Sequence, residues 1–369
     1  MMRICLIYGG KSVEHEISIV SANSILNNID RKKYKINGIY VTRNGSFKEA
    51  RIVKKKGRLE LRPTKNKIVF SLGRTRPVSI ENNNKIIRNI NIDIYFPVIH
   101  GTGGEDGSIQ GLLRTIDKPY VGSNTGSSAI CMDKILTKRI LTSVNIRTAS
   151  FIEIKKDEWK EKQKKIVTDI SSRIKFPCFV KVANLGSSVG IYKVKTKKEL
   201  ILKIRQAFTF STKIFIEEAV IDPDEIEVSV LGNQDCIVSS PGLVIPSSEF
   251  YDYNAKYIDG KSRFEIPFRK SQKKKALNNE IRQGAIKAYR TIGCEGMARI
   301  DFLYGKTKNI KTPRLFMSEI NTIPGFTAIS MYPKLLEYSG VAYKKLIDNL
   351  ITLAIKRYKA ESKLKTNIF

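Results

Sequence analysis

The segment from residue 296 to residue 331 constrains the fold more than any other, because it predicts two adjacent strands followed by a glycine turn. In the first strand, apolar side chains alternate with Arg299 and Asp301, so these two polar side chains share one face. In the second strand, Glu319 and Asn321 share a face in the same way. Antiparallel pairing would bring all four side chains onto one surface. The chain is therefore expected to contain a sheet with a polar, oxygen-rich patch.

This patch predicts a metal site. Asp301, Glu319 and Asn321 offer three oxygen ligands of the kind that Mg²⁺ prefers, and Mg²⁺ keeps its other positions for water and phosphate oxygens. Arg299 beside them could neutralise charge that develops during phosphoryl or acyl transfer. The alternative is a hairpin with a solvated, charged face. The turn PGFT at residues 324–327 favours the functional interpretation, because its backbone N–H groups could reach an anion.

Length and composition narrow the class of protein. A chain of 369 residues predicts two or three domains, and no apolar run approaches the ~20 residues of a membrane span. The N-terminus leads into a strand after too short an apolar run for a signal peptide. The five cysteines are far apart and form no CxxC pair, which predicts buried thiols in a reducing cytoplasm.

The net charge of +31, from 66 basic and 35 acidic residues, is the main argument for a nucleic-acid partner. The lysines, however, are spread through loops and helix faces, and aromatic residues are not interleaved with them as base-stacking platforms would require. A genome-wide bias towards lysine, asparagine and isoleucine is the simpler explanation. We expect no nucleic-acid partner and no membrane partner, and a basic nucleic-acid-binding protein stays the alternative function.

The first part of the chain predicts a β-α-β unit, with strand 3–8, a helix to about residue 28, and strand 34–41. Glu14 lies at the start of the helix, where capping and the helix dipole explain a carboxylate. The functional alternative is that Glu14 holds an ammonium group at the mouth of the sheet. Residues 43–92 are rich in lysine and asparagine and predict small hairpins.

A central parallel strand is predicted at residues 92–99, and it runs into a glycine-rich loop that begins with His100. Anions and polar ligands collect in such loops at the C-terminal ends of parallel strands. His100 is one of two histidines, and a structural and a catalytic role both stay open.

The middle of the chain carries lysines that a nucleotide could use. Residues 124–145 predict one helix, on which Lys134 and Lys138 are surface charges unless a nucleotide lies beside them. Lys181, on strand 176–182, precedes a Gly/Ser loop, and the two together could hold phosphates.

Acidic residues and a long loop follow. Glu217, at the end of strand 213–217, could contact adenine together with nearby backbone, and Glu225 could bind ribose hydroxyls. Acidic residues at strand edges are the structural alternative. Residues 250–257 are aromatic and polar without periodicity, which predicts a long loop of the kind that often forms a lid.

Seven motifs occur in order along the chain: GGKSVEHEIS, HGTGGEDGSIQG, MDK, VKVANLGSSVG, YDYNAKY, ARIDF and EINTIPGFT. Together they resemble the D-alanine–D-alanine ligase family of the ATP-grasp superfamily, over nearly the whole chain. The resemblance implies an α/β fold of three domains: a Rossmann-like βαβ substrate domain at residues 1–122, and two α+β ATP-grasp subdomains at 123–214 and 215–369. These two subdomains would sandwich ATP, and a lid loop at 247–260 would belong to the last.

The resemblance also implies a role for each matching residue. The residues that contact ATP would be Lys134, Lys181, Ser188, Glu217, Val220 and Glu225. Two Mg²⁺ ions, with Mn²⁺ as a possible substitute, would be held by Asp301, Glu319 and Asn321. The first D-alanine would meet Glu14 and His100, and the carboxylate of the second would meet Ser330 and Met331. The catalytic set would be Glu14, Ser187, Lys256, Tyr257, Arg299 and Gly325.

The implied reaction joins two D-alanines through an acylphosphate, with ATP as the energy source, for peptidoglycan precursor synthesis. Arg299 and the Gly325 N–H would stabilise the tetrahedral oxyanion. A related ligase that uses D-lactate typically carries histidine where this chain has Tyr257, so this chain is expected to make the dipeptide. Another acid and amine are the alternative within the superfamily. A cytoplasmic homodimer is implied by the resemblance alone.

Overall fold

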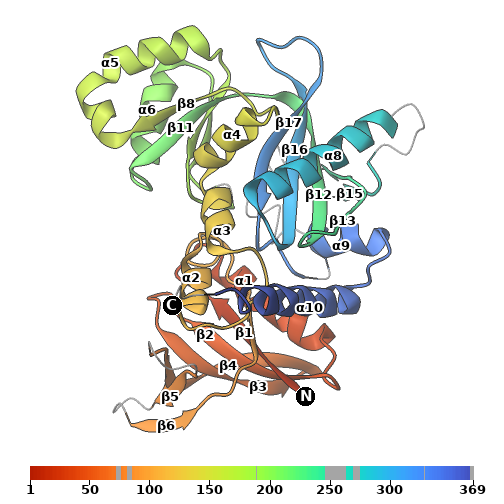
Figure 1. The fold of residues 1–369 in the computed structure, drawn as a ribbon. Helices are drawn as coiled ribbons and strands as arrows, with labels where there is room; N and C mark the ends of the chain where they lie inside the picture. Colours follow the sequence, from red (N-terminus) through yellow and green to blue (C-terminus); the bar gives the residue numbers. More distant parts are fainter. Residues whose placement is uncertain are drawn as a thin grey trace.

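A computed structural model describes residues 1–71, 76–80, 85–187, 189–245, 263–268, 275–327 and 329–365. Three sheets organise these residues, and Figure 1 shows them as the red and orange strands near the N-terminus, the group around β8 and β11, and the group from β12 to β17. Among the described residues, no helix combines the length and the apolar character needed to cross a membrane.

The first sheet begins with the predicted β-α-β unit. β1 (Met2–Gly9) and β2 (Tyr34–Val41) pair in parallel, and α1 (His15–Asn28) connects them. The residues from Ile4 to Ile7 are completely buried, as expected for a strand covered on both faces. β7 (Ile94–Pro97) pairs with the other side of β1. The sequence predicts a central strand here, but β7 is the last named strand of the sheet, with an isolated bridge to Tyr120 beyond it.

The described residues between 43 and 92 form the predicted hairpins, and these strands extend the first sheet. The antiparallel strands are β3 (Phe47–Lys55), β4 (Arg58–Val69), β5 (Val78–Ile80) and β6 (Ile86–Asn89). β3 pairs with β2, so the sheet runs in the order β6-β5-β4-β3-β2-β1-β7.

The second sheet has the order β10-β9-β11-β8, and two helices pack on it. Its strands are β8 (Phe151–Lys155), β9 (Cys178–Val182), β10 (Ile191–Val194) and β11 (Lys213–Glu218). The helices are α5 (Lys156–Arg173) and α6 (Lys197–Ala207), which bury Trp159, Ile170 and Ile204 against the strands.

The third sheet contains the paired strands predicted from residues 296–331. Its strands are β12 (Ile221–Gly232), β13 (Cys236–Val238), β14 (Gly242–Ile245), β15 (Arg263–Glu265), β16 (Gly296–Lys306) and β17 (Arg314–Asn321). The order is β15-β14-β12-β16-β17, with β13 paired to β12, and α8 (Lys275–Ile292) packs on one face. β16 and β17 are antiparallel, which confirms the predicted pairing.

Three helices connect the first sheet to the second: α2 (Ser108–Thr115), α3 (Thr125–Met132) and α4 (Lys134–Ser143). The single helix predicted over residues 124–145 is wrong, because the chain breaks at Asp133. The Asp133 carboxylate accepts hydrogen bonds from the backbone N–H groups of Ile135 and Leu136 and so starts a new helix. The break aims α3 and α4 in different directions, and both helices border the candidate site.

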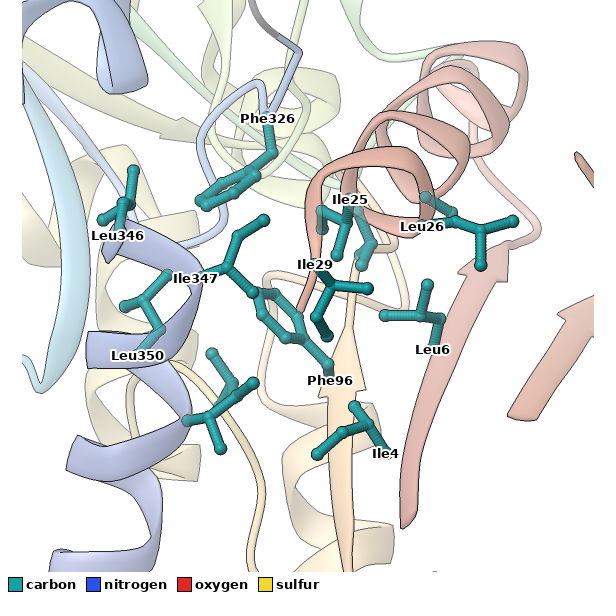
Figure 2. Packing of buried hydrophobic residues seen from close by; sticks show 14 of the residues in the cluster. Ile4, Leu6, Ile25, Leu26, Ile29, Phe96, Phe326, Leu346, Ile347 and Leu350 are labelled. Atoms are coloured by element: carbon teal, nitrogen blue, oxygen red, sulfur yellow. The ribbon is translucent and has the colours of Figure 1, made fainter. Parts of the chain in front are cut away.

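The last helices return to the first sheet. α9 (Met331–Tyr338) is followed by α10 (Tyr343–Glu361), which lies along the first sheet in Figure 1. Figure 2 shows side chains from both ends of the chain in one core: Ile4, Leu6, Ile25, Leu26, Ile29, Phe96, Phe326, Leu346, Ile347 and Leu350. The N-terminal sheet therefore completes its core with residues that lie more than 300 positions later.

Arg357 on α10 ties two parts of the fold together. Its Nη1 donates to the Gly122 carbonyl at 2.6 Å, and its Nη2 donates to the Tyr120 carbonyl at 2.8 Å. Nη1 also lies 3.2 Å from a carboxylate oxygen of Glu295, which precedes β16. The guanidinium is largely buried, so both carbonyls depend on it for hydrogen bonds.

Arg357→Met is expected to lower the free energy of unfolding by about 2–4 kcal/mol, because two buried carbonyls lose their donors. Urea unfolding followed by circular dichroism measures the change. Lys356→Met, at the neighbouring exposed position, is the control and should leave the urea midpoint unchanged. Equal midpoints for the two variants would show that Arg357 does not stabilise the junction.

Candidate active site

Two connected cavities lie where the three sheets meet. The larger one, of ≈ 690 Å³, is bordered by strands of the second and third sheets. The smaller one, of ≈ 40 Å³, also reaches the first sheet and the loop after β7. Lys134, Gly186, Ser187 and Glu319 line both cavities, so the two adjoin each other.

The larger cavity has the volume of a typical small-molecule site. Five of the six residues predicted to contact a nucleotide line it: Lys134, Lys181, Glu217, Val220 and Glu225. The sixth, Ser188, lies outside the described residues. β9, α4, β11 and β12 each contribute at least one of these side chains, so positions separated by up to 91 residues converge on one cavity.

Opposite charges lie close together on one wall of this cavity. Lys181 forms an ion pair with Oε2 of Glu217, and Lys138 forms one with Oε1. Burial alone would raise the pKa of Glu217, but the two lysines outweigh burial and lower it to about 2. Lys138 is not a surface charge, since its side chain is 2% exposed, and it lines the larger cavity, so the predicted alternative of a nucleotide beside it stays open.

The predicted metal-binding residues share one surface of the third sheet. Asp301 on β16 lies opposite Glu319 on β17, and Arg299 lies opposite Asn321. Asn321 Nδ2 donates to Asp301 Oδ2 at 3.1 Å. The period-2 alternation of the two strands therefore predicted this arrangement correctly.

Positively charged side chains lie next to these carboxylates. Arg299 donates from Nε and Nη2 to the two oxygens of Asp301, at 2.8 and 2.7 Å. Lys134 Nζ lies 3.6 Å from Glu319 and donates to the Leu185 carbonyl at 2.8 Å. Burial would lower the pKa of Arg299, but the neighbouring carboxylates raise it well above its ordinary value, so the guanidinium stays charged.

The donor set fits a hard divalent cation such as Mg²⁺, with two carboxylates and an amide oxygen on paired strands. In the described part of the chain, no three His, Cys, Asp or Glu side chains gather closely enough to hold a metal by themselves. The amide of Asn321 and oxygens of a bound phosphate would have to complete the coordination.

Glu227 on β12 is a residue of this surface that the sequence analysis missed. It lies opposite Asp301 in the sheet, and its Oε2 is 3.1 Å from Nε of Arg299. The guanidinium is therefore held by carboxylates from two strands. The alternation of side chains along the strand could have revealed it, because Glu227 lies two residues after Glu225 and therefore on the same face of the strand.

Glu14 lies in the smaller cavity and is 5% exposed. Ser187 donates to its Oε1 at 2.5 Å, whereas Oε2 has no hydrogen-bond partner among the described residues. Glu14 precedes α1 but makes no side-chain cap, so capping does not explain it. A Cβ on Gly101 or Gly186 would lie 2.5 or 2.7 Å from Oε2, so both glycines leave room for the carboxylate.

His100 lines the same cavity, with both ring nitrogens engaged. One nitrogen lies 2.9 Å from Ser21 Oγ and the other lies 2.9 Å from the Ile323 carbonyl. Burial lowers the pKa of His100, which favours the neutral ring. The imidazole therefore fixes the wall of the cavity and connects α1 to the turn after β17.

Glu105 was also missed, and it connects the loop after β7 to the turn after β17. Its carboxylate accepts from the N–H of Gly101 at 2.8 Å and from the N–H of Ile323 at 3.0 Å. Burial, together with the negative charge of Glu14, raises the pKa of Glu105 to about 8. A sequence motif could mark this glutamate, but the partner lies 218 residues away and no local pattern reveals it.

The raised pKa makes the stability contributed by Glu105 dependent on pH. The folded protein keeps the proton to about pH 8, whereas the unfolded chain releases it near 4.5, so this contribution falls as the pH rises between those values. The melting temperature of the native protein minus that of Glu105→Gln is therefore expected to decrease from pH 5 to pH 8. A difference that stays constant over this range would contradict the assignment.

The remaining predicted residues have different outcomes. Gly325 lines the smaller cavity. Ser330 Oγ accepts from the Thr327 N–H at 3.1 Å, and Met331 is buried against Val244 and Leu335, so neither lines the described cavities. Lys256, Tyr257 and the predicted lid at 247–260 lie outside the described residues.

Comparisons with known proteins agree on one family. Residues 3–123 match the family described as D-ala D-ala ligase N-terminus, and residues 140–352 match D-ala D-ala ligase C-terminus. The chain is 44% identical to the D-alanine–D-alanine ligase of Caldicellulosiruptor bescii over 369 residues, which cover 99% of this chain and 98% of the relative. It is 41% identical to that of Chloroherpeton thalassium, with 98% of each chain covered.

Solved structures match over the same length. The D-alanine-D-alanine ligase from Coxiella burnetii has a TM-score of 0.79 at 33% identity, with 98% of this chain and 96% of that chain covered. The VanG D-Ala:D-Ser ligase from Enterococcus faecalis has a TM-score of 0.79 at 30% identity, with 96% and 99% covered. The predicted fold class is confirmed, since the mixed α/β structure with three sheets matches these ATP-grasp ligases. On its sequence and its fold, this chain belongs to the D-alanine–D-alanine ligase family of ATP-dependent carbon–nitrogen ligases.

Proposed function

We propose that this protein joins two D-alanines to D-alanyl-D-alanine, with conversion of ATP to ADP and phosphate, in the cytoplasm and for peptidoglycan precursor synthesis. One observation carries the proposal: buried Glu14, whose Oε2 has no hydrogen-bond partner among the described residues, lines a cavity that adjoins a nucleotide-sized one. A buried carboxylate with a free acceptor suits the ammonium group of an amino acid.

The nucleotide would occupy the larger cavity. Lys134 and Lys181 supply positive charge for its phosphates, Glu217 and the backbone near Val220 would meet adenine, and Glu225 would meet the ribose. Asp301, Glu319 and Asn321 would hold two Mg²⁺ ions, or Mn²⁺, which supply charge neutralisation at the phosphates when bound. Ser188 and Lys256 are proposed as further phosphate contacts.

The reaction then needs positioning and charge neutralisation in two steps. The carboxylate of the first D-alanine, held through its ammonium by Glu14, attacks the γ-phosphate and forms an acylphosphate and ADP. The neutral amine of the second D-alanine attacks the acyl carbon, and phosphate leaves. Arg299 and the Gly325 N–H would stabilise the oxyanion of the tetrahedral intermediate, which is the largest catalytic contribution expected from this chain.

The identity of the second substrate, which supplies the nucleophile, has to be argued separately from the fold. The VanG relative of equal TM-score is a D-Ala:D-Ser ligase, so the shared fold does not select the nucleophile. We propose D-alanine, with its carboxylate near Ser330 and Met331, because Tyr257 gives the lid a neutral phenol where an imidazolium would repel an ammonium. Ser187 and Tyr257 would join Glu14 in closing the lid over the acylphosphate and excluding water.

The decisive experiment measures ADP release from purified protein with ATP and Mg²⁺, in the presence of D-alanine, L-alanine or no amino acid. Equimolar D-serine and D-lactate competitors, with the mass of each product recorded, test the second substrate. ADP and a D-alanyl-D-alanine mass that require D-alanine are the expected result. Folded protein without D-alanine-dependent turnover would overturn the proposal. Light scattering during size exclusion tests the homodimer that family resemblance suggests.

A further inference from the structure

Lys138 is a charged side chain inside the protein that the proposed mechanism does not use. It lies on α4, one helical turn after Lys134, and its side chain is 2% exposed. Its Nζ lies 5.7 Å from the centroid of the Phe151 ring and forms an ion pair with Oε1 of Glu217. Glu217 is therefore the carboxylate that compensates the buried charge of Lys138.

Burying an ammonium group is costly, so its surroundings have to compensate. Burial lowers the pKa of Lys138, and Glu217 opposes this shift, while Lys181 and Lys134 add repulsion. Two cations therefore share one carboxylate: Lys138 contacts Oε1 and Lys181 contacts Oε2. The two lysines differ in access, because the Lys181 side chain is 14% exposed on the cavity wall.

Because Lys181 is the more exposed of the two lysines, it would be the one to move towards a bound phosphate. Phosphates entering the larger cavity would draw the Nζ of Lys181 away from Glu217. Without a second cation, that movement would leave a buried carboxylate unpaired, and burial would then favour its neutral form. Lys138 also borders the larger cavity, but its side chain is 2% exposed against 14% for Lys181, so Lys181 is the lysine that phosphates would reach first.

We propose that Lys138 is a positioning residue for nucleotide selection: it keeps the Glu217 carboxylate paired and in place while Lys181 turns to the phosphates. This inference rests on the proposed nucleotide site. An ionised and fixed carboxylate accepts from the exocyclic amino group of adenine. Guanine presents a carbonyl oxygen at the same position, which faces the carboxylate without a donor, so the pair also selects adenine.

Lys138→Met tests the proposal, since methionine fills similar space without charge. Its KM for ATP is expected to rise about tenfold or more, with kcat changed much less, because ground-state binding is lost. The preference for ATP over GTP in kcat/KM should fall about tenfold or more. Lys138→Arg, which keeps the charge, should recover part of both losses.

The matched control is Arg139→Met. Arg139 is the next residue of the same helix and also forms an ion pair, with Glu153, but its side chain is 57% exposed and does not line the larger cavity. It should keep the native KM and the native preference for ATP. A folded Lys138→Met protein with both quantities unchanged would overturn the proposal.

A second comparison tests the proposal if the Lys138→Met protein does not fold. It compares Glu217→Gln with the double variant Glu217→Gln/Lys138→Met. If Lys138 acts through Glu217, the two proteins should bind ATP with similar affinity in calorimetry without D-alanine. A further loss of about tenfold in the double variant would contradict the inference. Native protein that binds ATP in this assay but shows no D-alanine-dependent turnover would instead refute only the proposed function.

Discussion

Arg299→Ala is expected to lower D-alanine-dependent ADP release by ~10²-fold or more, because the developing oxyanion loses its main cation. Carboxylates of the sheet hold the guanidinium in place, since Asp301 accepts from Nε and Nη2, and Glu227 lies 3.1 Å from Nε. Removal also leaves two carboxylates of adjacent strands without the cation between them. Steady-state turnover at saturating substrates measures the effect, and the melting temperature reports on the fold.

Two further variants show whether the loss of activity comes from the missing charge, from the missing guanidinium geometry or from a nonspecific effect of losing an arginine. Arg299→Lys keeps a cation but not the planar, two-pronged contact, so we expect only partial activity. Arg314→Ala changes an exposed arginine at the other end of β17 and should be nearly silent. Near-normal turnover in folded Arg299→Ala would remove Arg299 from the proposed mechanism.

Glu14→Gln is expected to lower kcat/KM for D-alanine by ~10²-fold or more, because the ammonium of the first substrate loses a buried charge partner. The change is close to isosteric, so the glutamine fits between Gly101 and Gly186, and its amide oxygen can still accept from Ser187. Initial rates over a range of D-alanine concentrations measure the effect. The apparent affinity for ATP should change little, since Glu14 does not line the larger cavity.

Glu16→Gln is the matched control for this second variant. Glu16 lies two residues later on α1, and its ion pair with Arg43 is exposed on both sides. We expect native kinetics from it. Equal kcat/KM values for Glu14→Gln and Glu16→Gln would mean that the unpartnered oxygen of Glu14 does not meet the substrate.

Strand periodicity carried most of what could be predicted from the sequence. The surface with Asp301, Glu319 and Asn321 was predictable because side chains alternate along paired strands, whereas the register shift after Asp301 was not predicted. The β-α-β opening followed from an apolar strand, a helical pattern and a second strand. Both patterns come from residues that are close together in the sequence, so they could be detected without knowledge of the tertiary structure.

Two of the three features that were not predicted depend on contacts between distant segments. Lys138 looks like an exposed charge from its helix alone, because the carboxylate that permits its burial lies on β11. Glu105 has no local sign of its bond to Ile323. The break at Asp133 needed a decision between a mid-helix aspartate and a cap, which the surrounding apolar spacing does not settle.

The core shared by the two ends of the chain has a consequence for synthesis on the ribosome. Ile4 and Phe96 are made early, but Leu346 and Ile347, which belong to the same core in Figure 2, emerge about 250 residues after Phe96. Part of the apolar face of the first sheet is therefore expected to stay exposed to solvent until α10 has been synthesised. Contacts between such distant segments form slowly, and exposed apolar surface makes a nascent chain prone to aggregation. Phe326 belongs to this same core, so we expect the turn that carries Gly325 to take its final position only when α10 docks. We expect the ability to bind substrate to be the last property that a growing chain acquires.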